Sequence, residues 1–205
     1  MKKYLSILLA VISVLSFAAC GNQQSEAETT ETTVQAEDSK DTQADSSSWK
    51  GYYREILTNK NYDYFDLIYI DNDDIPELFV SWEDFSSDGG VLYLPDADGS
   101  NEEDASYPVG YMGTVEYVEK GNVICWDYTI SGTVESYRID ENNRLEKVWE
   151  GKYGTEEVPL EGYYSNGENV SEEEYNNLLS EYYPENRKEA NRIPITEENI
   201  NKYLG

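Results

Sequence analysis

Four acidic side chains lie within seven residues of one short stretch, the segment DNDDIPE at positions 71–77. Hard cations such as Ca²⁺ are bound by about six to eight oxygen atoms, which come mainly from carboxylate and carbonyl groups. Asp71, Asp73 and Glu77 are therefore candidate ligands of a metal ion, and Ca²⁺ is the candidate cofactor. The sequence indicates no other cofactor.

The spacing of these acids resembles the D-x-D-x-D-G-x-x-E loop of dockerin, EF-hand-like and FG-GAP calcium repeats. In that register Asp71 and Asp73 stand at the third and fifth positions and Glu77 at the ninth. Tyr69 stands where the first aspartate is expected, and Asp74 replaces the glycine of the tight bend. These departures favour a second interpretation, in which the aspartates form an Asx-type turn and the glutamate accepts hydrogen bonds from nearby backbone amides.

A second acidic segment, PDADGSNEEDASYP at positions 95–108, is a weaker candidate for a calcium loop. Its carboxylates at Asp96, Asp98 and Glu103 have the spacing of a degenerate loop. The glycine, serine and asparagine around them offer no apolar anchor, which is typical of a solvated surface loop.

The composition argues against several kinds of catalysis. The chain has no histidine, so it lacks the usual general base and the commonest ligand of transition metals. One of its two cysteines, Cys125, lies in a strand-like apolar run and is expected to be buried. Carboxylate pairs abound among the 42 acidic residues, but none carries the signature of a glycoside hydrolase. We therefore expect no enzymatic activity and keep a carboxylate-based hydrolase as the minority alternative.

Residues 1–20, MKKYLSILLAVISVLSFAAC, have the features of an export signal. Two lysines precede an apolar stretch of about fifteen residues, which is shorter than the roughly twenty that a bilayer-spanning helix needs. The stretch ends in FAAC, which resembles the lipobox of bacterial lipoproteins, with Phe17 where leucine is usual. The resemblance implies cleavage after residue 19 and lipidation of Cys20. The expected location is the cell membrane, with the protein anchored in the lipid bilayer through Cys20 and facing outside, in the bacterial extracytoplasmic space.

Residues 20–48 are rich in serine, threonine, glutamate and glutamine and contain no aromatic residue. Such a segment cannot bury enough apolar surface to fold, so we expect a disordered acidic tether. The full chain has 42 acidic and 15 basic residues, a formal net charge of −27. A field of this sign repels polyanions, and nucleic acid is therefore excluded as a partner.

Residues 49–205 have the length of one domain with its own core, and we expect a single β-rich globular domain. Apolar residues at helical spacing predict a helix over 49–59. Near the C-terminus, Ser171 and Thr196 occupy N-cap positions of two further helices, and Pro184 ends the first of these. Short runs rich in Val, Ile and Tyr predict strands at 65–70, 77–82, 91–95, 113–120, 122–130, 133–140 and 144–151.

The predicted fold class is therefore α+β and mostly β. We expect an antiparallel β-meander sheet with short helices at the N- and C-terminal ends of the domain. The clearest hairpin connections are ISGTV, with Ser131 and Gly132, and IDENNRL, with Glu141 to Asn143.

Two motifs carry a wider resemblance. The first, FxLIxIDxDxIPEL, begins at Phe65, and the second, YYxNGxxVSEEEY, begins at Tyr163. In order and spacing they are similar to a family of uncharacterised surface lipoproteins of Gram-positive anaerobes, of clostridial type, whose members usually read DIDGDGIPEL in the acidic turn. The resemblance covers residues 50–183. It implies a surface lipoprotein with a β-rich domain and no particular activity.

These observations predict a non-catalytic binding or structural module at the cell surface. Its partner would be an extracellular protein, peptide or glycan that the sequence does not name. The alternative is a calcium-dependent binding module that uses the acidic turn at 71–77. Alternating aromatic residues could form a glycan-binding sheet face, but core packing is the expected use of Tyr117, Trp126, Tyr128 and Tyr137.

The Cys20→Ala substitution tests the anchor. Without the thiol no diacylglycerol can be attached, and each CH₂ group buried in the bilayer contributes about 0.8 kcal/mol to membrane binding. We expect the substituted protein to move from the membrane pellet to the soluble fraction after cell fractionation, whereas Cys125→Ala stays in the pellet. Retention of the Cys20 variant in the membrane after its signal has been cut would contradict lipid anchoring.

Overall fold

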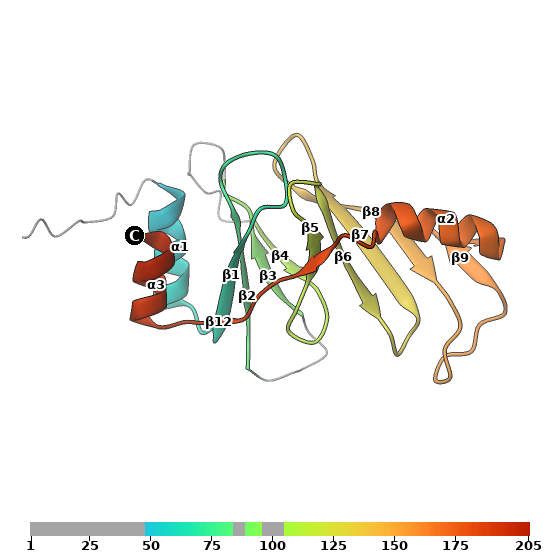
Figure 1. Cartoon of the computed structure of the whole chain (residues 1–205). Helices are drawn as coiled ribbons and strands as arrows, with labels where there is room; N and C mark the ends of the chain where they lie inside the picture. Colours follow the sequence, from blue (N-terminus) through green and yellow to red (C-terminus); the bar gives the residue numbers. More distant parts are fainter. Residues whose placement is uncertain (1–47, 84–88, 96–104) are drawn as a thin grey trace, which may run out of the picture. The chain divides into compact units, whose positions relative to one another are not determined.

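The strands of the described residues form two antiparallel sheets (Figure 1). This computed structural model describes residues 48–83, 89–95 and 105–205. The expected signal peptide at 1–19, the lipidation site Cys20 and the tether up to residue 47 lie outside these residues. The α+β, mostly β class is confirmed, and the meander expected as one sheet is divided between two.

The first sheet has the strand order β12-β1-β2-β3-β4. Its strands are β1 (Tyr64–Ile68), β2 (Glu77–Ser81), β3 (Gly90–Tyr93), β4 (Ser106–Val109) and β12 (Ile193–Pro194). The sequence did not predict β4, because residues 95–108 were interpreted as a solvated loop; residues 106–108 instead belong to this strand. The strand is at the edge of the sheet. Proline has no backbone N–H to donate, and an edge strand tolerates it because no further strand lies on its outer side to accept a hydrogen bond.

The second sheet has the strand order β10-β9-β8-β7-β6-β5-β11. Its strands are β5 (Glu116–Val118), β6 (Val123–Tyr128), β7 (Thr133–Ile139), β8 (Leu145–Lys152), β9 (Tyr163–Ser165), β10 (Glu168–Val170) and β11 (Lys188–Glu189). Both predicted hairpin turns are confirmed, between β6 and β7 and between β7 and β8. The β9–β10 hairpin was not predicted, although the Asn-Gly pair at its turn is a typical hairpin signal. In the structure Asn166 and Gly167 have φ angles of 49° and 85°, as such a two-residue turn requires.

Three helices of the described residues form where the sequence predicts them. Helix α1 (Trp49–Asn59) was predicted from its apolar spacing, and α2 (Glu172–Tyr182) and α3 (Glu197–Leu204) from their N-caps. The hydroxyl of Ser171 accepts a hydrogen bond from the Glu174 amide, and that of Thr196 accepts one from the Asn199 amide. Helix α2 stops at Tyr182, as expected two residues before Pro184. None of the helices in the described ranges is long and apolar enough to cross a membrane.

The first sheet is buried on both faces, which explains why all five residues of β2 are buried. Leu78 and Val80 pack with α1 and α3, which lie side by side in Figure 1. Phe79 points to the opposite face and packs in a core shared with Ile124 and Trp126 of the second sheet. Successive side chains of a strand point to opposite faces, so a strand between two cores is apolar throughout.

The C-terminal segment pairs with both sheets in succession. Strand β11 pairs with β5 of the second sheet and β12 with β1 of the first, and Figure 1 shows this segment crossing between them. At the crossing, the buried carboxylate of Asp66 accepts hydrogen bonds from the Asn191 backbone amide at 2.8 Å and from its side-chain amide at 2.9 Å. We call residues 188–194 the strap, because they connect the two sheets.

Replacing Asp66 with alanine tests how much the strap contributes to stability. The change removes both hydrogen bonds to Asn191, and hydrogen bonds to a charged group contribute about 1.5–3 kcal/mol each before the cost of burying the charge is subtracted. We expect the free energy of unfolding in urea to fall by about 1–3 kcal/mol. Glu146→Ala, at an exposed position of β8, should change it by less than about 0.5 kcal/mol. Equal effects of the two substitutions would contradict a stabilising role for the bond.

Candidate functional site

The predicted metal ligands converge in the connection between β1 and β2. Ile68 and Glu77 are the last paired residues of the two strands, so residues 69–76 form the turn. Asp71, Asp73 and Glu77 each present a carboxylate oxygen within 4.8 Å of the others. Asp73 is exposed and Asp71 partly buried, whereas Glu77 is only 3% exposed. We call these three residues the acidic cluster.

The hydrogen bonds of the turn match the second sequence interpretation. Asp71 Oδ1 accepts from the Asp73 amide at 2.9 Å, and Asp73 Oδ1 accepts from the Ile75 amide at 2.8 Å, which makes two successive Asx turns. Glu77 Oε2 accepts from the Ile70 amide at 2.8 Å. A carboxylate has two oxygens with about four lone-pair sites, so these bonds leave each group able to bind a cation as well.

The two departures from calcium loops have different consequences. Asp74 is fully exposed and outside the cluster, with the Lys120 ammonium 3.4 Å away. No residue from 69 to 77 has a positive φ. The turn therefore does not use the left-handed backbone conformation for which glycine is favoured. Tyr69 supplies no carboxylate, and its carbonyl accepts from the Lys120 amide at 2.8 Å. Asp74 in place of the glycine therefore causes no backbone strain, whereas Tyr69 in place of the first aspartate removes one carboxylate ligand.

Burial and mutual repulsion make the cluster electrostatically unfavourable without a counter-charge. Burial raises the pKa of Glu77 to about 8, and the charges of Asp71 and Asp73 add to the rise. Partial loss of hydration also raises the pKa of Asp73, although its side chain is exposed, and Asp71 and Asp74 contribute to the rise. A divalent cation among these groups would favour their charged forms and offset both effects.

Neighbouring elements hold the turn from two sides. The Tyr53 hydroxyl of α1 donates to the Pro76 carbonyl at 2.7 Å in a buried hydrogen bond. The Asn122 amide, at the start of β6, donates to the Ile70 carbonyl at 2.7 Å. Both contacts join residues far apart in the chain, which is why the sequence did not reveal them.

The other candidates are placed differently. Tyr117 and Trp126 are buried in the core shared by the sheets, Tyr128 and Tyr137 pack against it, and this core packing was the expected use. The Trp126 and Tyr137 rings stack with their centroids 4.8 Å apart. Cys125 is buried as predicted, and burial raises its pKa to about 12, so the thiol is unreactive. The weaker calcium candidates, Asp96, Asp98 and Glu103, lie outside the described residues.

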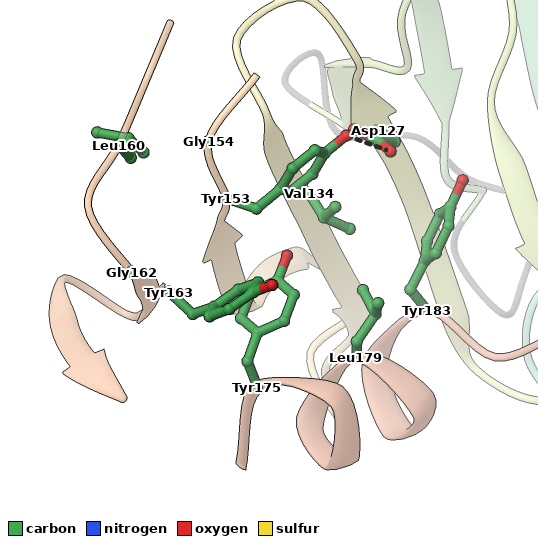
Figure 2. A pocket seen from close by; sticks show the side chains of 10 residues that line it. All are labelled: Asp127, Val134, Tyr153, Gly154, Leu160, Gly162, Tyr163, Tyr175, Leu179 and Tyr183. Atoms are coloured by element: carbon green, nitrogen blue, oxygen red, sulfur yellow. Dashed lines mark hydrogen bonds between the residues drawn. The ribbon is translucent and has the colours of Figure 1, made fainter. Parts of the chain in front are cut away.

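A second group of side chains, which the sequence did not indicate, surrounds a cavity of about 450 Å³ (Figure 2). It lies between the second sheet and α2. Its lining includes one carboxylate and four tyrosines, and we call it the tyrosine pocket: Asp127, Tyr153, Tyr163, Tyr175, Leu179 and Tyr183. These residues belong to β6, β9 and α2, except that Tyr153 and Tyr183 directly follow β8 and α2. Their proximity depends on tertiary packing rather than on any spacing in the chain.

The raised pKa of Glu77 predicts a dependence of stability on pH when no divalent cation is present. Between about pH 4.5 and 8 the folded protein keeps a proton on Glu77 that the unfolded chain has released. The free energy of unfolding should therefore fall as pH rises through this window, by an amount on the order of a few kcal/mol. Urea unfolding at several pH values in EDTA measures it.

The Glu77→Gln variant should show a flatter dependence, because glutamine does not titrate. Part of the slope should remain, since burial also raises the pKa of Asp66 and of Asp127. Glu146→Gln, at an exposed position, serves as the control and should keep the slope of the unsubstituted protein. A Glu77→Gln slope as steep as that of the control would show that Glu77 does not titrate in this window.

Comparisons of the chain with protein-family models, with curated proteins and with solved structures found no match. The similarity to clostridial-type surface lipoproteins thus remains an expectation from two sequence motifs. The function has to be inferred from the geometry and chemistry of the residues themselves.

Proposed function

We propose that this protein is a lipid-anchored extracytoplasmic module without catalytic activity, whose domain binds Ca²⁺ at Asp71, Asp73 and Glu77. The observation that supports the ion site is the convergence of three carboxylates within 4.8 Å, one of them almost fully buried. The charges of Asp71 and Asp73 add to the raised pKa of Glu77, so the arrangement is unfavourable without a cation. A bound ion supplies the missing positive charge.

The donor set is that of a hard cation. All three ligands are carboxylates, and the chain has no histidine that would favour a transition metal. Mg²⁺ demands near-ideal octahedral geometry and gives up water reluctantly, whereas Ca²⁺ accepts irregular sets of oxygen ligands. Three carboxylates leave several positions to water or carbonyl oxygens. The expected dissociation constant is in the range of extracellular calcium modules, about 10⁻⁴–10⁻³ M.

The ion would order the junction at which the turn, α1 and the start of β6 meet. The Tyr53 hydroxyl and the Asn122 amide already hold the backbone on either side of the cluster. Ion binding would therefore stabilise contacts of both sheets rather than the turn alone. In this proposal calcium keeps the domain folded outside the cell, where it contacts a protein, peptide or glycan partner.

Thermal unfolding in EDTA and in about 10 mM Ca²⁺ tests the ion site. Because 10 mM is about ten to a hundred times the expected dissociation constant, the ion adds about 1.4–2.7 kcal/mol to the folded state. For a domain of this length, that corresponds to a rise in Tm of roughly 3–10 °C. Mg²⁺ at the same concentration should raise Tm by less.

The matched pair Asp73→Asn and Asp74→Asn separates a specific site from general charge screening. Both substitutions remove one negative charge from the same turn, but only Asp73 belongs to the cluster. We expect Asp73→Asn to abolish most of the calcium-induced rise and Asp74→Asn to retain it. Equal calcium responses in the two variants, or none in the unsubstituted protein, would exclude the site.

A further inference from the structure

The tyrosine pocket contains a buried hydroxyl group that has no hydrogen-bond partner. Tyr175 extends from α2 and is 3% exposed, and its hydroxyl oxygen finds no partner among the described residues. Figure 2 shows this hydroxyl pointing away from α2, toward the cavity beside Tyr163 and Val134. Buried polar groups are nearly always hydrogen-bonded, so an exception inside a cavity indicates a missing partner.

The pocket also holds a carboxylate that pairs with no cation. Asp127 is half-buried, and its two oxygens accept from the Tyr153 hydroxyl at 3.1 and 3.0 Å. Burial raises its pKa, because removing a carboxylate from water disfavours its charged form. Among the described residues it forms no ion pair: the neighbouring Arg187 is bound by Glu116 at 2.9 Å and lies over the Tyr183 ring at 3.6 Å.

The remaining walls are suited to a positive charge. Four tyrosine rings line the cavity, and no lysine or arginine is among its lining residues. The face of an aromatic ring is electron-rich and attracts organic cations, the more strongly when the cation is removed from water. The net charge of −27 adds a long-range field that concentrates cations. A neutral sugar could stack on the rings but would leave the Asp127 charge uncompensated.

We propose that the tyrosine pocket binds a small organic ammonium ion that carries a hydroxyl group, the chemistry of choline. The ammonium group would lie near Asp127 against the tyrosine rings, and the ligand hydroxyl would bond to the Tyr175 hydroxyl. The cavity of about 450 Å³ is ample for such an ion. This inference goes beyond the calcium proposal and does not depend on it, because the pocket contains no residue of the acidic cluster.

Calorimetric titration of the full chain with choline, in EDTA and at low ionic strength, tests the proposal. Its uncharged carbon isostere, 3,3-dimethyl-1-butanol, has the same shape and the same hydroxyl group. We expect saturable choline binding and at least tenfold weaker binding of the isostere. Equal affinities, or no choline binding, would overturn the proposal, as would a neutral monosaccharide that binds more tightly than choline. A thermal melt of the same sample in EDTA shows whether the domain is folded without calcium, so a missing choline site is distinguished from unfolding that follows loss of the ion.

Phosphocholine distinguishes a free amino alcohol from the same ammonium group esterified in a head group. Its phosphate replaces the hydroxyl and brings bulk and negative charge to the Tyr175 side of a pocket whose lining has no basic residue, so we expect at least tenfold weaker binding than for choline. Equal or tighter binding would overturn the assignment of a free hydroxyl to the Tyr175 side of the pocket.

Two substitutions in the pocket have matched controls on α2. Asp127→Asn should weaken choline binding at least tenfold, and Tyr175→Phe about fivefold, while Tyr175→Phe leaves Tm unchanged or raises it. Glu181→Gln removes an exposed charge and Tyr182→Phe a hydroxyl outside the pocket, and both should bind choline normally. If the Asp127 and Tyr175 variants remain folded and bind as the unsubstituted protein does, the pocket is not the site.

Discussion

The hydrogen bonds between the Asp66 carboxylate and Asn191 fix the place where the strap passes from one sheet to the other. On either side of them lie two backbone bonds of 2.9 Å: the Ala190 amide of the strap donates to the Val115 carbonyl, and the Ile195 amide, directly after the strap, donates to the Asp63 carbonyl. The two sheets share one core, which requires a defined position of each relative to the other. The strap also leads into α3, which packs beside α1. The core that these two helices form with β2 therefore depends on the same crossing.

The shared core and the strap explain why the acidic turn is ordered. Its ends belong to β1 and β2, which are buried on both faces, and its middle is held by Tyr53 and Asn122. The same packing removes Glu77 from water and raises its pKa. The packing that orders the turn therefore also makes the charged form of Glu77 unfavourable, because a carboxylate held in a packed junction loses its hydration.

The two candidate sites share one property: each contains a buried or half-buried carboxylate without a basic side chain paired to it. The ion pairs of the described residues lie elsewhere, as between Lys147 and Glu135 or Lys152 and Glu150. Asp66 accepts three hydrogen bonds, from the Leu67 amide and from both amides of Asn191. Glu77 accepts from the Ile70 amide, and Asp127 from the Tyr153 hydroxyl. For the other two carboxylates, we propose that the missing positive charge comes from outside the protein, as Ca²⁺ at Glu77 and as an organic ammonium ion at Asp127.

Local features of the sequence determined the elements. Ser171 and Thr196 cap their helices by bonds to residues three positions away, and the helical spacing of apolar residues predicted 49–59 with its observed ends. The alternation of acids within seven residues similarly placed Asp71, Asp73 and Glu77 in one turn. Hydrogen bonds and steric preferences over three or four residues suffice for all of these, so the chain needs no distant partner to show them.

Tertiary structure alone decided how these elements meet. The division into two sheets, the strap and the tyrosine pocket arise from contacts between residues that are distant in the sequence, such as Asp66 with Asn191 or Asp127 with Tyr153. It also decided which of the 19 tyrosines became core and which line a cavity. A tyrosine that packs in the core and one that lines a cavity have the same spacing in the sequence. Only the packing around the side chain determines whether its hydroxyl has a hydrogen-bond partner.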